Sequence, residues 1–201
     1  MMHGIQGIDI VHWQVDDDVA LGLFQPWHAP EVFNLVESSR VHLRRWLPWV
    51  DQQQRVEDAQ AFIQDAIEQF VEGEAVHVGI WYRDRLAGVI GYHRIDNAHR
   101  VGEIGYWLGE QYQGRGIMTR ACRAMVAYGF AELKLNRIEI KCTPENVRSR
   151  AVPERLGFRE EGILREAETM GSVYVDNIVY GLFAQDDCRH MRTDQAPDDG
   201  A

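Results

Sequence analysis

The spacing of apolar residues along the chain follows two periods, one typical of strands and one typical of helices. Over residues 56–72 the apolar side chains recur every three or four positions, which predicts an amphipathic helix. A second helix with one buried face is predicted after residue 116, and a third begins near Pro30, a residue suited to a first helical turn. Strand-like runs fill the segments between them, over residues 8–15, 20–25, 75–82, 86–95, 101–109, 137–142, 158–164 and 173–183. Strands interleaved with helices, without an internal repeat, predict a mixed α/β layer.

Length and composition favour a single domain over residues 1–184. With 201 residues, 45% of them hydrophobic, the chain can bury one large core. Residues 185–201 mix acidic, basic, Pro and Gly residues without periodicity, which predicts a disordered polar tail. No apolar run reaches the roughly 20 residues that span a bilayer, and the N-terminus lacks the pattern of a signal peptide. We therefore expect a cytoplasmic protein with no membrane partner.

Charge and cysteine content narrow the classes of ligand. The net charge of −10 repels nucleic acid and attracts cations, so amines are the expected substrates and nucleic acid is not an expected partner. The same charge could serve solubility alone. Cys122, Cys142 and Cys188 form no CxxC or Cys/His pattern, so neither a disulfide framework nor a metal site is predicted. We interpret Cys122 and Cys142 as small buried apolar residues.

The strongest chemical signal is a short loop that places Gly114 and Gly116 one residue apart, just before the helix predicted after residue 116. Glycines accept positive φ and let main-chain N–H groups approach a ligand, and a helix start adds unpaired donors and the positive end of its dipole. The pattern indicates a cradle for an anion such as a pyrophosphate. A P-loop is excluded, because it needs four residues between its glycines and a Gly-Lys-Ser/Thr ending. An ordinary helix entrance, or a dinucleotide fingerprint with Thr119 in place of its third glycine, remain alternatives.

Two strand-like segments flank this loop and its helix. Residues 101–109 contain three glycines, which predict a bulge or splay where a ligand can reach the main chain. Residues 137–142 form the second strand, and Asn146, Ser149 and Gly157-Phe158 follow it. In this order the segments resemble the Gcn5-related N-acetyltransferases. In that family a Gln/Arg-x-x-Gly-x-Gly/Ala loop holds the pyrophosphate of acetyl-CoA, and an Asn-x-x-Ser…Gly-Phe segment borders the pantetheine arm and the thiol.

The resemblance covers roughly residues 8–184 and is closest to the Rim-type branch, which acetylates α-amino groups of ribosomal proteins. It is carried by residues 45–49, 103–108, 113–118 and 140–142. It implies the acyl-CoA N-acyltransferase fold, in which helices cover both faces of a central, mostly antiparallel, splayed sheet. One departure is Pro153, which suits the short helix after Asn146 only at an early turn, if that helix starts late.

The resemblance assigns acetyl-CoA to the glycine loop and the segments around it, with no metal. Main-chain N–H groups of the loop, helped by the Arg115 side chain, would hold the phosphates. Asn146 would hold the pantetheine amides, or else cap the following helix. The full set of expected cofactor-binding residues is Trp107, Leu108, Gln111, Gly114, Arg115, Gly116, Ile117, Met118, Thr119, Asn146 and Ser149.

Three residues are candidate catalytic groups. Ser149 would protonate the departing CoA thiolate, although it could equally serve as a helix cap. Glu168, 19 residues later in the connection between the last two predicted strands, stands where the Rim-type resemblance places a functional glutamate. Glu103, on the strand that borders the cofactor, is the second candidate base. The alternatives are a solvated loop acid for Glu168 and a structural carboxylate for Glu103.

The expected acceptor site is formed by aromatic and polar residues. Trp46, Trp49 and Tyr106 could wall the entrance, or belong to the core. Asp176 and Tyr180, on the final strand, could hold the incoming amine.

The sequence therefore predicts an acetyl-CoA-dependent N-acetyltransferase acting on a primary amine, the α-amino group of a protein or peptide. The alternatives are a small-molecule amine acetyltransferase, acting on an antibiotic, polyamine or aminoacyl conjugate, and a catalytically silent acyl-CoA-binding module. A homodimer is also expected, since relatives often form one.

Overall fold

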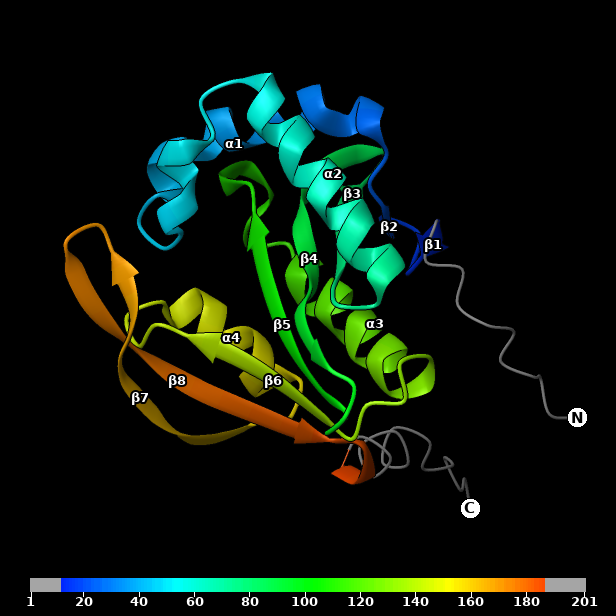
Figure 1. Ribbon diagram of the computed structural model, residues 1–201, viewed down its shortest axis with the longest axis vertical. Helices are drawn as coiled ribbons and strands as arrows, with labels where there is room; N and C mark the ends of the chain where they lie inside the picture. The colour runs from blue at the N-terminus through cyan, green and yellow to red at the C-terminus, as the bar shows by residue number, and fades with distance from the viewer. Residues whose placement is uncertain (1–11, 187–201) are drawn as a thin grey trace, which may run out of the picture.

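The structure, a computed structural model, describes residues 12–186, and its elements follow the predicted order (Figure 1). The N-terminal half contains β1 (Trp13–Gln14), β2 (Val19–Leu23), α1 (Ala29–Leu43), α2 (Val56–Glu72), β3 (Val76–Tyr82) and β4 (Arg85–Asp96). The C-terminal half contains β5 (Val101–Leu108), α3 (Ile117–Ala131), β6 (Arg137–Cys142), α4 (Val147–Arg155), β7 (Arg159–Met170) and β8 (Val173–Phe183). Short 3-10 turns occur at Pro26–His28, Pro48–Gln52 and Glu110–Tyr112.

Most predicted boundaries agree with the structure, and the helix predicted over residues 56–72 is α2. Two expectations are corrected. The strand expected to end at residue 164 continues to Met170, so Glu168 lies in β7 rather than in a connecting loop. Pro153 lies well inside α4, which starts early, at Val147.

Several predictions at the chain ends fall partly or wholly outside the described residues. The first predicted strand is described only from residue 12 onward, where it forms β1. Of the predicted tail, residues 185 and 186 lie in a helical turn, and residues 187–201, with Cys188, lie outside the described part. Within the described part, no helix is long and apolar enough to cross a membrane.

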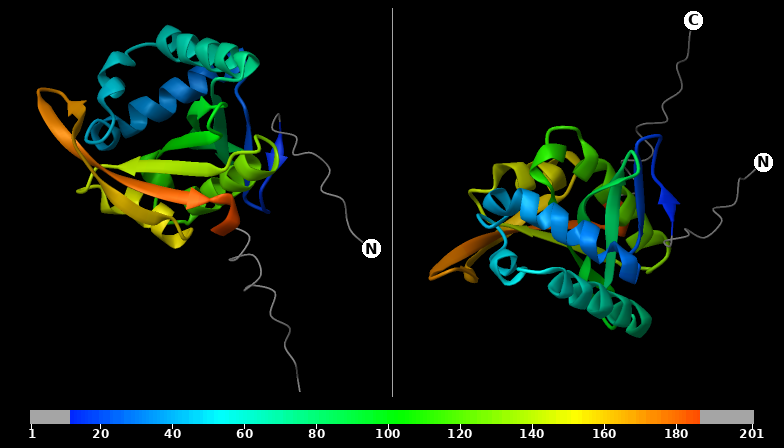
Figure 2. Two further views of the ribbon diagram at one scale, coloured as in Figure 1. Left: turned by 60° about the horizontal axis from the view of Figure 1, so that its bottom comes forward. Right: turned by 90° about the horizontal axis from the view of Figure 1, so that it is seen from above.

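The sheet has eight strands in the order β1-β2-β3-β4-β5-β6-β8-β7. All neighbouring strands run antiparallel except β5 and β6, which are parallel. The helices cover both faces, with α1 and α2 on one side and α3 and α4 on the other (Figure 2). The predicted mixed, mostly antiparallel sheet with helices on both faces is therefore confirmed.

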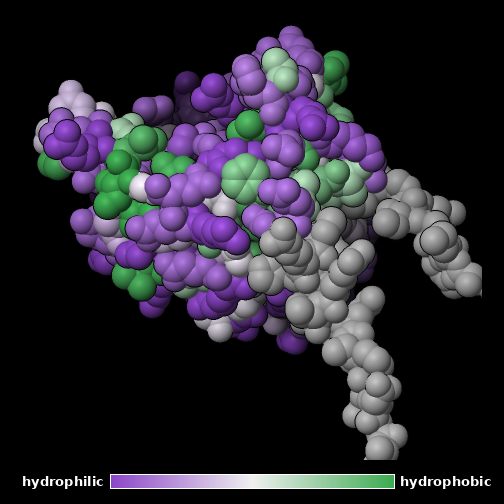
Figure 3. All heavy atoms as spheres, turned by 90° about the horizontal axis from the view of Figure 1, so that it is seen from below, coloured by the Kyte–Doolittle hydropathy of each residue, from purple (hydrophilic) through white to green (hydrophobic). Residues whose placement is uncertain are grey.

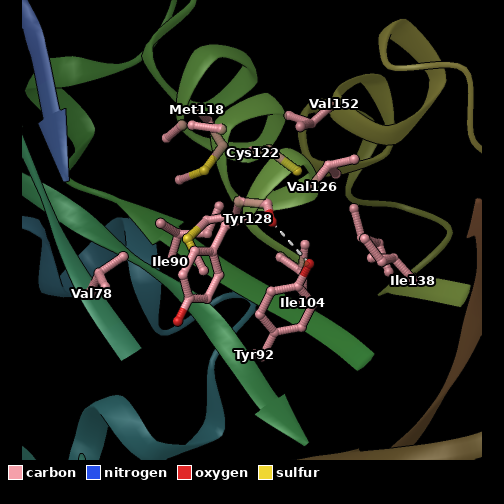
Figure 4. Close-up of a cluster of buried hydrophobic side chains, with 14 of the residues drawn as sticks. Val78, Ile90, Tyr92, Ile104, Met118, Cys122, Val126, Tyr128, Ile138 and Val152 are labelled. Carbon is pink, nitrogen blue, oxygen red and sulfur yellow. Dashed lines mark hydrogen bonds between the residues drawn. The ribbon is translucent and has the colours of Figure 1, made fainter. Parts of the chain in front are cut away.

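A hydrophobic core lies on each face of the sheet, and alternate residues of β4 contribute to one core and then the other. Val89 packs with α1 and α2, whereas its neighbour Ile90 packs with α3, as expected when successive side chains point to opposite faces. The larger core lies beneath α3 and contains Tyr92, whose hydroxyl donates a 2.9 Å hydrogen bond to the carbonyl of Met125 (Figure 4). This core fixes α3, and with it the loop that precedes α3, against the sheet.

The centre of the sheet opens into a V. Strands β5 and β6 are paired only between residues 101–104 and 137–140. Beyond these residues β5 continues to pair with β4, while β6 continues to pair with β8. The two strands diverge from this point (Figure 1). Residues 105–108 of β5 therefore have no partner strand on this edge, as the predicted splay requires.

The face seen in Figure 3 is mostly hydrophilic, with scattered apolar patches. The β7–β8 hairpin projects from the body of the protein (Figure 1), and β7 is an edge strand. Four large apolar side chains of this hairpin are exposed: Ile163, Leu164, Val173 and Tyr174.

Candidate active site

A cleft of about 1600 Å³ occupies the opening between β5 and β6. Its walls come from the diverging ends of these strands, the glycine loop, the first turns of α3 and α4, the end of α1 and the middle of β7. Pockets for a single small ligand typically measure about 300–1,000 Å³. The cleft therefore has room for two substrates side by side.

The glycine loop forms one end of the cleft and has the conformation that the sequence predicts. Gly114 and Gly116 have φ values of +72° and +68°, and Gly116 is the N-cap of α3. A Cβ atom at either position would meet no atom within 4 Å, so the requirement for glycine is conformational rather than steric. The N-cap residue, a glycine, has no side chain to cap α3. Its first N–H groups point outward as donors for an anion.

Two arginines surround this loop. The guanidinium of Arg115 lies 5.9 Å from the centre of the Tyr82 ring. Arg120 donates two 2.9 Å hydrogen bonds to the carboxylate of Asp16 and one of 3.4 Å to the carbonyl of Arg115. Both arginines line the cleft, but Asp16 offsets the charge of Arg120, so Arg115 supplies the positive charge beside the start of α3.

Ser149 lies in the first turn of α4, beside the open edge of β5. Its N–H donates to Oδ1 of Asn146 at 3.2 Å, so Asn146 caps the helix, as one of the two interpretations expects. The Ser149 hydroxyl lies 3.2 Å from Cys142 Sγ and 3.4 Å from the Tyr106 hydroxyl. Ser149 and Asn146 both face the cleft.

Cys142 also lines the cleft, although the sequence suggested only a buried apolar role. Burial raises the pKa of its thiol, and this effect exceeds the opposing hydrogen bonds from Ser149 and Tyr106. The thiol is therefore neutral near pH 7, which makes it a poor nucleophile.

The carboxylate of Glu103 contacts the side chains of Lys141 and His93. Its Oε2 accepts a 2.7 Å hydrogen bond from Lys141 Nζ, and its Oε1 lies 3.1 Å from His93 Nε2. Burial alone would raise the pKa of Glu103, but the hydrogen bonds from His93 and Lys141 outweigh burial and lower the pKa to about 2. A carboxylate with so low a pKa accepts a proton poorly at neutral pH. Among residues 12–186, no cluster of His, Cys, Asp or Glu could hold a metal ion.

Glu168 lies on β7 and lines the same cleft as Glu103 and Lys141. The register between β7 and β8 shifts between Leu164 and Glu168, which marks a bulge. Asn177, buried on β8, donates a 3.3 Å hydrogen bond to Glu168 Oε2. Asp176 accepts a 2.8 Å hydrogen bond from the N–H of Glu166, inside the bulge. The side chains of Asp176 and Asn177 thus shape the strand that carries Glu168.

Asn177 lines the cleft, and the sequence alone did not indicate this role. The available signal was a polar pair, Asp176-Asn177, within an otherwise apolar strand.

The structure brings most of the expected cofactor residues together. All of them line the cleft except Gln111, whose side chain accepts a 3.4 Å hydrogen bond from Ser39 on α1. Trp46 and Tyr106 also line the cleft. Trp49 does not, because it packs against Trp107 with ring centres 5.9 Å apart.

The structure places the two polar candidates of the last strand away from the cleft lining. Tyr180 is buried against α4, where its hydroxyl accepts from Arg150 at 3.0 Å and donates to Glu154 at 2.9 Å. Asp176 is engaged with the β7 bulge. Both therefore support elements that carry other site residues, instead of facing an acceptor.

A further polar group at the rim was not anticipated. The side chain of Gln113 contacts both His42 on α1 and Arg148 on α4, so it links the two walls. Burial lowers the pKa of His42, and this effect outweighs the nearby carboxylate of Glu110, which raises it. His42 is therefore neutral at pH 7 and can accept a hydrogen bond from the Gln113 amide.

Comparisons with known proteins agree with this geometry. Residues 19–159 match the sequence family described as "Acetyltransferase (GNAT) domain". The ribosomal-protein-serine acetyltransferase of Escherichia coli (strain K12) is 32% identical over 167 residues, which cover 83% of this chain and 93% of that protein.

Solved structures share the whole architecture. The microcin C7 self-immunity acetyltransferase MccE, in complex with acetyl-CoA and AMP, is similar with a TM-score of 0.84 and 29% identity over 88% of this chain and 98% of its own. RimL, a ribosomal L7/L12 alpha-N-protein acetyltransferase in complex with coenzyme A, has a TM-score of 0.84 and 28% identity over 88% of this chain and 99% of its own. A family match over most of the chain, a relative at 32% identity and the open sheet with its glycine loop lead to one assignment. The chain belongs to the GNAT acetyltransferase family.

Proposed function

We propose that this protein transfers the acetyl group of acetyl-CoA to the α-amino group of a protein or peptide N-terminus in the cytoplasm. The observation that carries the proposal is a single cleft in which an anion cradle, Ser149 and Glu168 lie together. The similarity to a ribosomal-protein-serine acetyltransferase and to RimL supports a protein acceptor.

Acetyl-CoA fits the polar groups that line this cleft. The free N–H groups at the start of α3, with the positive charge of Arg115, suit its pyrophosphate. From there the pantetheine arm can follow the unpaired edge of β5, residues 105–108, where main-chain groups have no partner on β6. Such an arm hydrogen-bonds to the strand much as a neighbouring strand would. Its thioester would then lie near Ser149.

The reaction needs a base for the amine and an acid for the thiolate. In our proposal Glu168 removes a proton from the neutral acceptor amine as its nitrogen attacks the thioester carbonyl carbon. The bond from that carbon to sulfur then breaks, and the Ser149 hydroxyl donates a proton to the CoA thiolate. Glu168 releases its proton to solvent and Ser149 regains one from solvent, which restores both groups. The thioester is already activated, so alignment of the two substrates supplies much of the acceleration.

The electrostatics favour Glu168 over Glu103 as the base. Glu103 is committed to Lys141 and His93, and its pKa of about 2 makes it a weak base. Asn177 donates a hydrogen bond to Oε2 of Glu168, and among residues 12–186 no donor is paired with Oε1, so this oxygen can accept from an amine. Glu103 therefore acts as a structural carboxylate that fixes Lys141 and His93 at the base of the V.

The acceptor is expected to enter beside Trp46 and β7, opposite the glycine loop. Glu168, on the β7 wall of the cleft, and the net charge of −10 favour a cationic amine. The exposed apolar side chains of the β7–β8 hairpin support the predicted homodimer, which sedimentation velocity would test.

The function is tested by CoA release from acetyl-CoA with matched peptides whose N-termini are free or blocked, beside polyamines and amino-sugar antibiotics. Turnover with free N-termini alone supports the proposal. Turnover with small amines alone would identify the protein as a small-molecule amine acetyltransferase. Acetyl-CoA binding without turnover on any acceptor supports the silent module. With an active acceptor, Ser149→Ala and Glu168→Gln should each lower kcat by about 10²-fold or more.

A further inference from the structure

Proline at position 153 changes the hydrogen bonding of α4 around Ser149. In an α-helix the N–H of residue 153 would donate to the carbonyl of residue 149. Pro153 has no N–H, so the carbonyl of Ser149 is left without its helical partner. This is the carbonyl of the residue that our mechanism uses as the acid.

Tyr106 supplies the missing donor. Its hydroxyl donates a 2.9 Å hydrogen bond to the main-chain oxygen of Ser149. Burial raises the pKa of the Tyr106 hydroxyl well above its ordinary value, so the group keeps its proton and remains a donor. The same hydroxyl lies 3.4 Å from Ser149 Oγ.

The hydrogen bond from Tyr106 to the Ser149 carbonyl connects the two sides of the opening between β5 and β6. Tyr106 lies on the part of β5 that has separated from β6, and Ser149 lies on α4, which packs against β6. With Asn146 on its N–H and Tyr106 on its carbonyl, both main-chain groups of Ser149 are fixed. A regular helical bond from residue 153 would instead satisfy the carbonyl within α4, and the link to β5 would depend on the longer 3.4 Å contact between the hydroxyls of Ser149 and Tyr106.

We propose that Tyr106 and Pro153 form a positioning pair, in which Pro153 leaves the Ser149 carbonyl to Tyr106 and Tyr106 fixes the Ser149 hydroxyl relative to β5. The inference rests on the proposed role of Ser149 as the acid. Neither residue transfers a proton to the substrate, and both act through Ser149.

Five variants test the pair: Tyr106→Phe, Pro153→Ala, Ser149→Ala, and the double variants that combine Tyr106→Phe with each of the other two. Tyr106→Phe should lower kcat by about tenfold and change the KM for acetyl-CoA by less than about threefold, because the partly buried Ser149 carbonyl loses the hydrogen bond from Tyr106. In the Pro153→Ala background the same substitution should lower kcat by less than about threefold, since alanine at this position restores the helical N–H donor. In the Ser149→Ala background it should have no effect on kcat.

The control is Tyr92→Phe. Tyr92 makes the same kind of bond, from a buried hydroxyl to a helical carbonyl at 2.9 Å, but in the core beneath α3. This variant should reduce thermal stability and leave kcat within about twofold.

The outcomes separate this inference from the proposed function. If Ser149→Ala keeps wild-type kcat, the acid assignment fails, and the positioning role fails with it. If Ser149→Ala is slow but Tyr106→Phe is not, only the positioning pair is overturned. The positioning pair would also be overturned if Tyr106→Phe lowered kcat by the same factor in the wild type and in the Ser149→Ala background.

A structural readout needs no turnover. Labelling with ¹³C-carbonyl serine and ¹⁵N arginine selects Ser-Arg peptide bonds, of which the chain has two, Ser149-Arg150 and Ser39-Arg40. The Ser149 carbonyl shift should move in Tyr106→Phe and return towards the wild-type value in the double variant, while the Ser39 signal stays constant. An unchanged Ser149 shift in Tyr106→Phe would refute the bond.

Discussion

Glu103→Gln tests whether the carboxylate at the base of the V is structural or catalytic. Glutamine keeps the size of the side chain and its ability to accept from Lys141, but it removes the negative charge. The ion pair with Lys141, at 2.7 Å, is buried enough for that charge to matter, because the Glu103 side chain is only 14% exposed.

The contribution of the Glu103 charge to the free energy of unfolding follows from its pKa, which falls from 4.5 to about 2 in the folded protein. Each pKa unit corresponds to about 1.4 kcal/mol, and partial solvent screening reduces the total to roughly 2–3 kcal/mol. Since folding lowers this pKa, the stabilisation is fully present above pH 4.5 and is lost as the pH falls from 4.5 towards 2.

The assay is urea unfolding of the wild type and Glu103→Gln at pH 7 and at several values below 4.5. The difference in unfolding free energy should be roughly 2–3 kcal/mol at pH 7 and should shrink steadily in the acid range. In parallel, kcat at pH 7 should stay within about threefold of wild type, because a carboxylate of such low pKa is a weak base. Glu161→Gln is a control, since it removes a carboxylate from Arg137 outside the cleft and should leave kcat unchanged.

Two results would refute this reasoning. A stability difference that is the same at pH 3 and pH 7 would mean that the Glu103 charge does not stabilise the fold. A loss of kcat of about 100-fold without loss of stability would make Glu103 the base and displace Glu168.

The remaining predictions concern the cradle and the β7 bulge. Gly116→Ala should raise the Kd for acetyl-CoA by at least about tenfold, because a left-handed residue costs about 1–2 kcal/mol and the donors move. Gly73→Ala is the matched control: Gly73 has φ +73° and open space around its Cβ position, so calorimetry should show equal destabilisation with unchanged binding. Asp176→Ala should lower kcat by about three- to tenfold, since the β7 bulge loses a hydrogen bond. The KM of the Asp176→Ala variant for acetyl-CoA should not change. An unaltered kcat in this variant would show that Asp176 does not position Glu168.

The sequence by itself determined the local features. The glycine pair could be assigned to a cradle because φ and helix-end donors depend on a few neighbouring residues. Helix α2 could be placed from its period for the same reason, and the Asn146 cap was one of two stated options. The order of segments around Ser149 was sufficient for the family resemblance, because that order is itself a property of the sequence.

Tertiary structure decided the chemistry of the individual groups. The pairing of Glu103 with Lys141 depends on the parallel contact of β5 and β6, which brings together residues 38 positions apart. The bond from Tyr106 to Ser149 spans 43 positions and depends on how widely the two strands diverge. No local period encodes register or divergence, since both arise from packing between elements distant in the chain. The sequence therefore identified most of the residues at the glycine-loop end of the cleft, and the fold determined the others and the partners of each polar side chain.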